Sequence, residues 1–268
     1  DDVADARSVA FRLGMPFYVF NFKEAFRREV MDRFVQAYER GETPNPCIDC
    51  NRYIKFEKLM RRGEETGFPY IATGHYARVE FDGAAGRWLL KKGLDENKDQ
   101  SYMLWSLTQW ELSRLLLPLG GLTKERVRQL AEEHGFLNAR KRDSQDICFV
   151  PDGDYAAFLG LSFPQPMFVK ELDVEKNRVV LAKAEELFSQ EVIARDINLI
   201  SVESIPAPLR VKARVRYRQK EQPATVLQTG PDELRVVFDQ PQRAVTPGQS
   251  LVLYDGDTVV GGGKIARK

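Results

Sequence analysis

The chain has 268 residues, of which 43% are hydrophobic and 29% charged, so it is too apolar for a disordered chain and too long for a small disulfide-stapled scaffold. Forty Lys and Arg against 39 Asp and Glu leave a net charge of +1, so a nucleic-acid surface would have to come from local clustering of charge. No apolar run approaches the roughly 18 residues of a membrane helix, and three sparse cysteines indicate a reducing, cytoplasmic compartment.

The first 76 residues carry the alternating pattern of an α/β layer. Apolar residues at helical spacing predict three helices, and short wholly apolar runs predict two buried strands of a parallel sheet. The expected helices cover 3–13, 22–40 and 53–67, and the expected strands cover 16–20 and 70–73. Prolines predict a loop over 42–50. Strand, helix and strand in this order predict a doubly wound, Rossmann-like sheet.

The rest of the chain changes character twice. Thr108 and Glu111 match a capping box, which predicts a helix that ends at Pro118, and a second helical face closes at Gly135. Toward the C-terminus, turn signals separate five short strands, which predicts a small all-β barrel or sandwich. These strands cover 209–220, 223–229, 233–239, 250–254 and 258–265.

The first of these expected strands has cations at alternate positions, a feature called here the basic stripe. Because side chains alternate between the two faces of a strand, all of these cations would lie on one face and the intervening apolar residues in the barrel core. Such a stripe favours a phosphate backbone as partner, and the simpler interpretation is a solvated face neutralised by neighbouring Asp and Glu. The cations are Arg210, Lys212, Arg214, Arg216, Arg218 and Lys220.

The three cysteines are the candidate chemical groups. Cys47 and Cys50 form a Cys-x-x-Cys pair, which suits a metal, a redox disulfide or an activated thiolate. Zinc is disfavoured because a structural site needs four ligands and a partner pair does not occur, and an iron–sulfur cluster on three cysteines is the better metal alternative. Cys148, among apolar neighbours, has the default interpretation of a small buried residue. The sequence contains no Rossmann-type or Walker-type glycine-rich loop.

Six segments resemble those of one family and occur in the family's order along nearly the whole chain. They are 43–51 (TPNPCIDCN), 72–78 (ATGHYAR), 98–102 (KDQSY), 143–149 (DSQDICF), 216–219 (RYRQ) and 244–250 (AVTPGQS). On these motifs the chain is similar to the bacterial tRNA-uridine 2-sulfurtransferases, the tRNA-specific 2-thiouridylases. The resemblance implies an α/β fold with an adenine-nucleotide-binding PP-loop domain at 1–159, a small central domain at 160–205, and a tRNA-binding antiparallel β-barrel at 206–268.

The resemblance also implies a chemistry that uses ATP, with Mg²⁺ as its expected companion. Uracil O2 is a poor leaving group, so ATP first adenylates it, and persulfide sulfur then displaces AMP at C2 of the wobble uridine. The family's nucleophile falls on Cys50 and its persulfide carrier on Cys148. Transfer of the terminal sulfur leaves the other sulfur to be resolved, most simply as a Cys50–Cys148 disulfide.

The family's binding residues carry over onto matching positions of this chain. Gly74 is implied to contact ATP, and no matching position is a metal ligand. The implied tRNA contacts are Asn45, Pro46 and Cys47 at the target base, with His75, Lys98, Asp99, Gln100, Arg216, Tyr217 and Gln249. The implied partners are tRNA and a sulfur-relay or cysteine desulfurase protein. The enzyme is expected to be a monomer in the cytoplasm, away from the membrane.

Three departures from the family pattern qualify these expectations. The family's pyrophosphate loop, Ser-Gly-Gly-Val-Asp-Ser, does not occur, so the chain as written is expected to lack its main site for the ATP phosphates. Some members have Asp where Cys47 stands, and Asp49 is the candidate for the acid–base role here. Only the end of the family's central Gly-, Arg- and Lys-rich stretch is found, which predicts that residues are missing between Leu159 and Gly160.

Two other classes of function stay open at this level. An RNA-binding module whose cysteines are structural or hold a metal would bind tRNA without thiolating it. A PP-loop enzyme acting on a small molecule would share the nucleotide domain, but it gives no reason for the aligned cations of the basic stripe.

Overall fold

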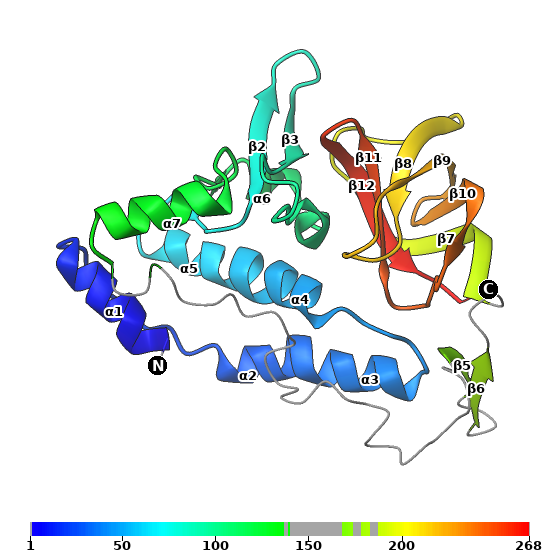
Figure 1. Cartoon of the computed structure of the whole chain (residues 1–268), viewed down its shortest axis with the longest axis horizontal. Helices are drawn as coiled ribbons and strands as arrows, with labels where there is room; N and C mark the ends of the chain where they lie inside the picture. The colour runs from blue at the N-terminus through cyan, green and yellow to red at the C-terminus, as the bar shows by residue number, and fades with distance from the viewer. Residues whose placement is uncertain (1, 137–138, 140–167, 174–177, 183–186, 268) are drawn as a thin grey trace.

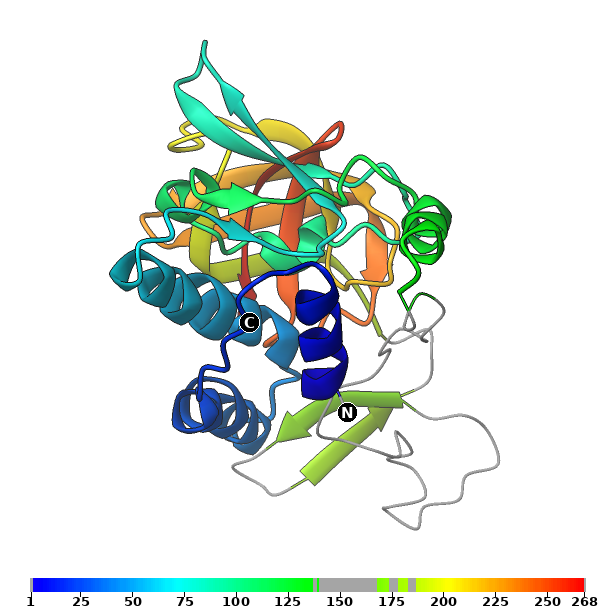
Figure 2. The ribbon, with the colours of Figure 1, turned by 90° about the vertical axis from the view of Figure 1, so that its left-hand side faces the viewer.

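The computed structural model in Figure 1 describes residues 2–136, 139, 168–173, 178–182 and 187–267. A layer of helices from the N-terminal part of the chain stands beside a β-barrel from the C-terminal part, and a β-hairpin projects above the junction. In the view turned by 90°, the two long helical runs lie below the barrel (Figure 2). Among the described residues, no helix combines the length and hydropathy needed to span a bilayer. The expected order, an α/β domain followed by an antiparallel barrel, is confirmed.

Two long helical runs form the N-terminal layer, and each contains a wider π-helical stretch. The first run comprises α2 (Lys23–Phe26), η1 (Arg27–Asp32) and α3 (Arg33–Glu39), and the second comprises α4 (Pro46–Asp49), η2 (Cys50–Lys58) and α5 (Leu59–Glu65). The shorter helix α1 (Asp2–Arg12) precedes them. The π-helical stretches η1 and η2 are in contact. Their apolar stripes bury Val30 of the first run and Phe56 of the second.

The second run begins inside the segment that the prolines predicted to be a loop, so that prediction holds for 42–45 but is wrong from Pro46 onward. Pro46 occupies the first helical position, where its missing N–H costs no hydrogen bond and its fixed φ suits a helix. Asn45 caps this end, because its side-chain oxygen accepts the backbone N–H of Cys47 at 3.1 Å. Cys47 and Cys50 therefore lie in the first turn of a helix rather than in a loop.

The parallel pairing in the N-terminal half is short. Strand β1 (Ile71–Ala72) pairs in parallel with β4 (Leu115–Leu116). The strand predicted at 16–20 does not form, and Tyr18 and Val19 are 66% and 63% exposed. A strand needs a neighbour to accept its hydrogen bonds, and no strand of the described residues pairs with this segment.

The segment after residue 100 departs from its predicted helix. The capping box of Thr108 and Glu111 is present and starts α6 (Gln109–Leu112), but the chain then extends into β4, so the helix expected to reach Pro118 is wrong beyond its first turn. The helix that closes at Gly135 is confirmed as α7 (Lys124–Glu133). The projecting hairpin is β2 (Ala77–Asp82) with β3 (Arg87–Lys92), and a 3₁₀ turn, η3 (Ser101–Leu104), follows it.

Six antiparallel strands close into the barrel in the order β11-β8-β9-β10-β7-β12, and pairing of β11 with β12 completes the circle. They are β7 (Phe188–Leu199), β8 (Leu209–Arg214), β9 (Gln222–Gly230), β10 (Glu233–Arg243), β11 (Ser250–Asp255) and β12 (Thr258–Ile265). Strand β7 lies in the segment that the resemblance placed in a central domain, so the barrel starts before residue 206. A separate antiparallel pair consists of β5 (Phe168–Asp173) and β6 (Arg178–Ala182).

The barrel and the helical layer share one hydrophobic core. Trp105, next to η3, and Tyr254, from β11, belong to a buried cluster that also takes side chains from η2. Trp105 Nε1 donates to Ser250 Oγ at 3.0 Å. Gly262 of β12 has no room for a side chain, because a Cβ there would lie 2.6 Å from the carbonyl oxygen of Leu251 and 3.0 Å from the Trp105 ring. Backbone and aromatic ring therefore meet directly at this junction.

Candidate functional site

The two thiols of the Cys-x-x-Cys pair lie on one face of the helix that begins at Pro46. The N–H of Cys50 bonds to the carbonyl oxygens of Pro46 and Cys47, which closes this first turn. Ile48 and Asp49, between the cysteines, are buried at 2% and 6% exposure, whereas Cys47 is exposed and Cys50 half-buried. The helix thus turns its acidic and apolar side chains inward and its thiols outward.

An ion-pair network anchors this turn to the barrel. Lys264 Nζ of β12 lies 3.4 Å from Asp49 Oδ1 and 3.4 Å from Asp196 Oδ2 of β7. Arg52, one turn further along the helical run, pairs with the same Asp196 oxygen at 2.8 Å. Asp196 has a left-handed backbone (φ 53°), a conformation that Asp adopts more readily than most residues. Two barrel strands therefore fix the residue that precedes Cys50.

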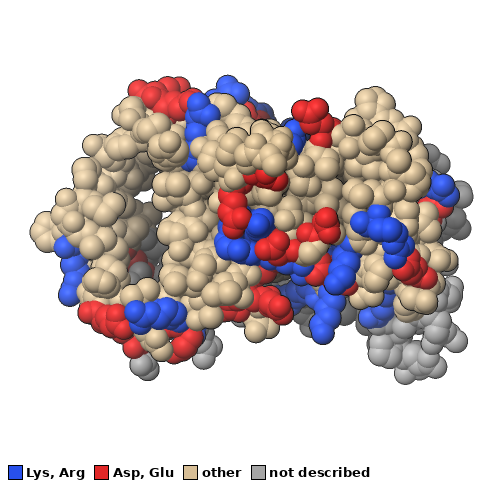
Figure 3. Space-filling view, turned by 90° about the horizontal axis from the view of Figure 1, so that it is seen from above, with Lys and Arg blue, Asp and Glu red and all other residues tan. Residues whose placement is uncertain are grey.

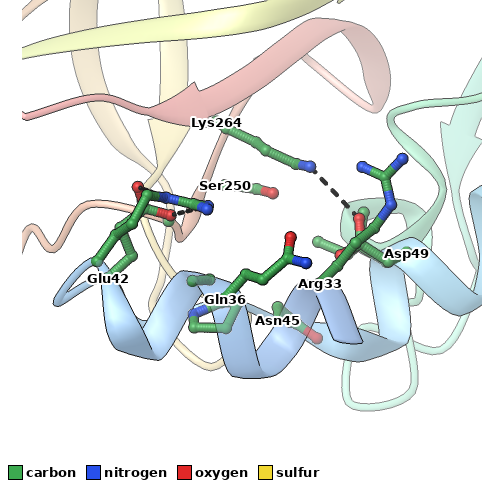
Figure 4. Close-up of a pocket in the computed structure, with 12 residues that line it drawn as sticks. Arg33, Gln36, Glu42, Asn45, Asp49, Ser250 and Lys264 are labelled. Carbon is green, nitrogen blue, oxygen red and sulfur yellow. Dashed lines mark hydrogen bonds and ion pairs between the residues drawn. The ribbon is translucent and has the colours of Figure 1, made fainter. Parts of the chain in front are cut away.

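A polar cavity of about 220 Å³ lies on the inner side of α4, between α3 and the barrel. Figure 4 shows Gln36 and Lys264 pointing into it from opposite walls, with the Lys264–Asp49 pair along one side. Cations and acids both contribute, so its charge is mixed. Its lining is Arg33, Gln36, Ala37, Arg40, Glu42, Pro44, Asn45, Ile48, Asp49, Gly248, Ser250 and Lys264.

The implied tRNA residues Tyr217 and Gln249 tie other segments of the chain to Asp99 and to Thr43, which lies four residues before Cys47. Tyr217 Oη donates to the carbonyl oxygen of Asp99 at 3.2 Å. Burial, with the charges of Asp99 and Cys47 nearby, raises the pKa of Tyr217, which keeps its hydroxyl protonated as a donor. Gln249 Nε2 donates to the carbonyl oxygen of Thr43 at 2.6 Å and so ties a barrel loop to the segment leading into α4.

The Asp99 side chain faces inward. It is 5% exposed and accepts the backbone N–H of Gly93 and both the N–H and the hydroxyl of Ser101. Arg214 lies 3.7 Å from Asp99 Oδ2, the oxygen that also accepts the Ser101 hydroxyl. With these partners the carboxylate organises the turn before η3 and supports Tyr217 through its backbone.

The residues that follow β1 form a second group. His75 is 9% exposed, contacts Thr73 Oγ1 through Nδ1 at 2.8 Å, and stacks obliquely on Phe56. Burial, with the positive charge of Lys55, lowers the pKa of His75 to about 4, so its ring is neutral at pH 7. Gly74 beside it is exposed, at the carboxyl end of a parallel strand where α/β sheets bind ligands.

The implied contacts Lys98 and Gln100 frame the same region. Gln100 Oε1 accepts the backbone N–H of Tyr76 at 2.9 Å, and Tyr76 O accepts the N–H of Gln100 at 2.9 Å, so the two segments that carry the resemblance are joined directly. Lys98 is half-buried. The structure therefore brings together five separate parts of the chain, the segments around 45–51, 73–76, 98–102, 216–217 and 249.

The basic stripe is only partly formed. The alternation holds within β8, but that strand ends at Arg214 and the chain turns over the next residues, so the prediction of six cations on one strand face is wrong. Arg210 forms a two-pronged pair with Asp239 at 2.7–2.8 Å, and Arg214 is largely buried against Tyr254. The simpler interpretation, neutralisation by neighbouring acids, therefore holds for these two.

The remaining cations of the stripe differ in exposure. Arg216 donates to the carbonyl oxygen of Ala244 and to Thr246 Oγ1, and burial lowers its pKa. Lys212, Arg218 and Lys220 are exposed. Figure 3 shows Lys and Arg interspersed with Asp and Glu over the upper face of the molecule, without a continuous basic surface on that side.

Some of the predicted residues lie outside the part of the chain that the structure describes, and sequence reasoning missed some residues that the structure shows. Cys148 lies outside the described residues, as does the junction of Leu159 and Gly160. Within the part of the chain that the structure describes, no three His, Cys, Asp or Glu side chains are placed to hold a metal ion. Sequence reasoning missed Arg52, Asp196 and Lys264, because partners separated by 144 or 215 residues carry no local spacing signal.

Comparisons with known proteins agree on both halves of the chain. The family model described as tRNA methyl transferase HUP domain matches residues 1–152, and the model described as aminomethyltransferase beta-barrel domain matches 189–265. The tRNA-specific 2-thiouridylase MnmA of Clostridioides difficile (strain 630) is 44% identical over 303 residues, covering 99% of this chain and 84% of the relative. Those of Carboxydothermus hydrogenoformans and Acetivibrio thermocellus are each 44% identical, covering 99% and 98% of this chain and 83% and 84% of the relatives.

The lengths of these alignments bear on the predicted internal gap. Each runs over more than 300 positions, whereas the chain has 268 residues. The relatives therefore have residues inside the matched region that have no counterpart here. The alignment lengths agree with the expectation of missing residues, but they do not place them at Leu159–Gly160.

Proposed function

The chain belongs to the family of tRNA-specific 2-thiouridylases, and we propose that it converts the wobble uridine of tRNA to 2-thiouridine through the thiols of Cys50 and Cys148. Both family models have names that refer to methyl transfer, whereas the relatives are named for thiolation. The chemistry follows the relatives, because sulfur transfer gives a role to the thiols that the helix presents outward.

The single observation that carries this proposal is the position of Cys50. It lies, half-buried, in the capped helical turn that Asp49 anchors to Lys264 of the barrel, and the charge of Cys47 in the same turn acts on Tyr217. A thiol held in this way can meet a base gripped between the helix and the barrel, since reacting groups must be pre-positioned within a few ångströms.

ATP, with Mg²⁺, is the proposed activator, and when bound it supplies the adenylyl group that turns uracil O2 into a leaving group. Gly74 is the proposed contact. It is exposed at the end of β1, and a Cβ there would meet only Leu119 at an ordinary 3.6 Å, so its backbone is open to a ligand. The backbone at this position is therefore accessible to a nucleotide.

The tRNA grip is proposed to use both halves of the molecule. Asn45, Pro46 and Cys47 would meet the target base, and His75, Lys98, Gln100, Arg216, Tyr217 and Gln249 would contact the surrounding RNA. Because His75 is neutral at pH 7, it would act through hydrogen bonding or stacking rather than by pairing with phosphate. Asp99 would act through the turn that it organises and through its carbonyl group, which holds Tyr217.

Cys148 is the proposed persulfide carrier, loaded by a sulfur-relay or cysteine desulfurase protein. Its terminal sulfur bonds to C2 of the activated uridine as AMP leaves with O2. The Cys50 thiolate then attacks Cys148 Sγ, the S–S bond breaks toward the base, and a Cys50–Cys148 disulfide remains. Two electrons from the thiols thereby reduce the transferred sulfur to the thiocarbonyl level.

The test is measurement of 2-thiouridine in digested tRNA by mass spectrometry, with Cys50→Ser and Cys148→Ser in the full-length enzyme. Each variant is expected to lose product by about three orders of magnitude or more, as for removal of a covalent nucleophile. Unchanged tRNA affinity and unfolding midpoints serve as controls. Persistent thiolation in either variant contradicts the two-thiol mechanism. Stoichiometric iron or zinc, with tRNA binding but no thiolation, would support the metal-binding module instead.

A further inference from the structure

The chain has a third thiol, Cys47, whose task the two-thiol reaction does not explain. We propose that Cys47 is the resolving thiol: it displaces Cys148 from the Cys50–Cys148 disulfide and leaves a Cys47–Cys50 disulfide within the first turn of α4. The inference rests on the proposed function, because the sulfur transfer supplies the disulfide that Cys47 attacks.

Helix geometry places the two sulfurs within bonding reach. Residues three apart in a helix have Cα atoms about 5 Å apart, inside the range of about 4.4–6.8 Å that disulfides span. The Cys50 N–H bonds to the carbonyl oxygens of both Cys47 and Pro46, which tightens the turn. A disulfide can therefore close here without unwinding the helix.

The side-chain directions also favour the pair. Ile48 and Asp49 are buried, so the turn is fixed with Cys47 and Cys50 on its outer face. Asn45 accepts the backbone N–H of Cys47, and the ion pair of Asp49 with Lys264 ties the inner side of the turn to β12. Neither thiol needs to cross the helix to reach the other.

The exchange balances without an added oxidant. The Cys47 thiolate attacks Cys50 Sγ, the Cys50–Cys148 bond breaks, and Cys148 leaves as a thiolate that takes up the proton lost by Cys47. Cys148 is then free to accept the next sulfur. An external dithiol, oxidised to its own disulfide, reduces the Cys47–Cys50 bond and restores both thiols.

The first experiment maps disulfides after one turnover. Full-length enzyme loaded with persulfide sulfur reacts with tRNA and ATP without reductant, is quenched with N-ethylmaleimide, and is digested for peptide mass spectrometry, with disulfides counted per 2-thiouridine formed. The parent enzyme is expected to show the Cys47–Cys50 disulfide and alkylated Cys148. Cys47→Ser is expected to show about ten-fold more Cys50–Cys148 disulfide than the parent. A parent enzyme that holds Cys50–Cys148 with Cys47 alkylated overturns the inference.

The second experiment does not depend on turnover. Cys148→Ser, which keeps only Cys47 and Cys50, is equilibrated in glutathione redox buffers without tRNA, and its matched control is the double variant Cys47→Ser with Cys148→Ser, which keeps only Cys50. Closure of an intramolecular disulfide, seen as the loss of two hydrogens, is expected only in Cys148→Ser. Glutathione adducts without closure overturn the inference, as does an iron–sulfur cluster that occupies all three thiols. Thiolation by Cys50→Ser would instead refute the proposed function, and the buffer experiment would still decide whether the pair exists.

Discussion

The barrel and the N-terminal helical layer differ in how fully their own residues supply the strand pairing and bury the apolar side chains. Each of the six barrel strands pairs on both sides, and Leu234 and Phe238 in its core are 0% and 1% exposed. In the helical layer, Phe11 and Tyr18 are 87% and 66% exposed, and the parallel pairing is two residues long. A closed barrel leaves no free edge, so it supports itself, whereas the helical layer relies on the barrel for its shared core.

The largest expected effect contrasts one leucine from each region. Leu234→Ala in β10 removes a fully buried side chain and should lower the free energy of unfolding by about 2–5 kcal/mol. Leu13→Ala, at a leucine that is 52% exposed, should change it by about 0.5 kcal/mol or less. Urea unfolding monitored by tryptophan fluorescence gives both values. Equal losses would mean that the N-terminal layer packs as tightly as the barrel.

A pH effect isolates the buried histidine of the helical half. The folded-state pKa of His75 is about 4 and its ordinary unfolded value about 6.5, so between these values the unfolded chain binds the extra proton. Stability therefore falls as pH drops through this window, and His75 alone should contribute about 2 kcal/mol of loss between pH 7 and pH 5. His75→Gln should flatten urea midpoints over that interval. An unchanged slope would assign the acid sensitivity to other groups.

The ion pair at the junction should give a smaller effect. Lys264→Met removes the cation that pairs with Asp49, whose side chain is 9% exposed. The variant should lower the free energy of unfolding by about 1–2 kcal/mol, which is less than for a fully buried pair because Lys264 is partly solvated. Lys91→Met is the matched control, since its partner Glu80 is 46% exposed. Water can solvate Glu80 in this variant, so the free energy of unfolding should fall by about 0.5 kcal/mol or less. Similar losses in both variants would remove the special role of the junction pair.

The smallest effect concerns the surface cations of the barrel. Arg210→Gln removes a charge already paired with Asp239 at an exposed site, so tRNA affinity should change less than about two-fold. Arg218→Gln removes an exposed cation and, if it meets a phosphate, should reduce the slope of log K against log salt by about 0.7–0.9. Filter binding at several salt concentrations measures both. A slope unaffected by Arg218→Gln would place the RNA elsewhere.

Five of the six strands of the barrel could be predicted from sequence because turn residues separate apolar alternation cleanly, whereas β7 was not predicted. The end of β8 could not, since the alternating cations continue past Arg214 while the chain turns to carry Tyr217 toward Asp99. The helix that begins at Pro46 was missed because a proline at the first helical position gives the same local sequence signal as a proline in a loop. The leucines after α6 fit both a helix face and the strand β4, and only the neighbour β1 decides between them.

For the candidate site, too, the sequence could predict some features and not others. Its segments could be predicted from their motifs, but their meeting could not, because the partners of Asp49 and Arg52 lie far away along the chain. The inward direction of the Asp99 carboxylate was equally hidden, since two of the groups that donate to it are backbone N–H groups, which leave no mark in the residue pattern.

The contact of Gly262 with Trp105 has a consequence for variation among related enzymes. Where backbone rests on an aromatic ring, no rotamer change can absorb an added carbon, so even Gly262→Ala would wedge β12 away from the helical half. The separation between β12 and the ring of Trp105 is therefore set by the backbone of Gly262 and by no side chain that could change its rotamer. Substitutions elsewhere in the core can be absorbed by repacking of side chains, whereas a substitution at this position has to move a strand.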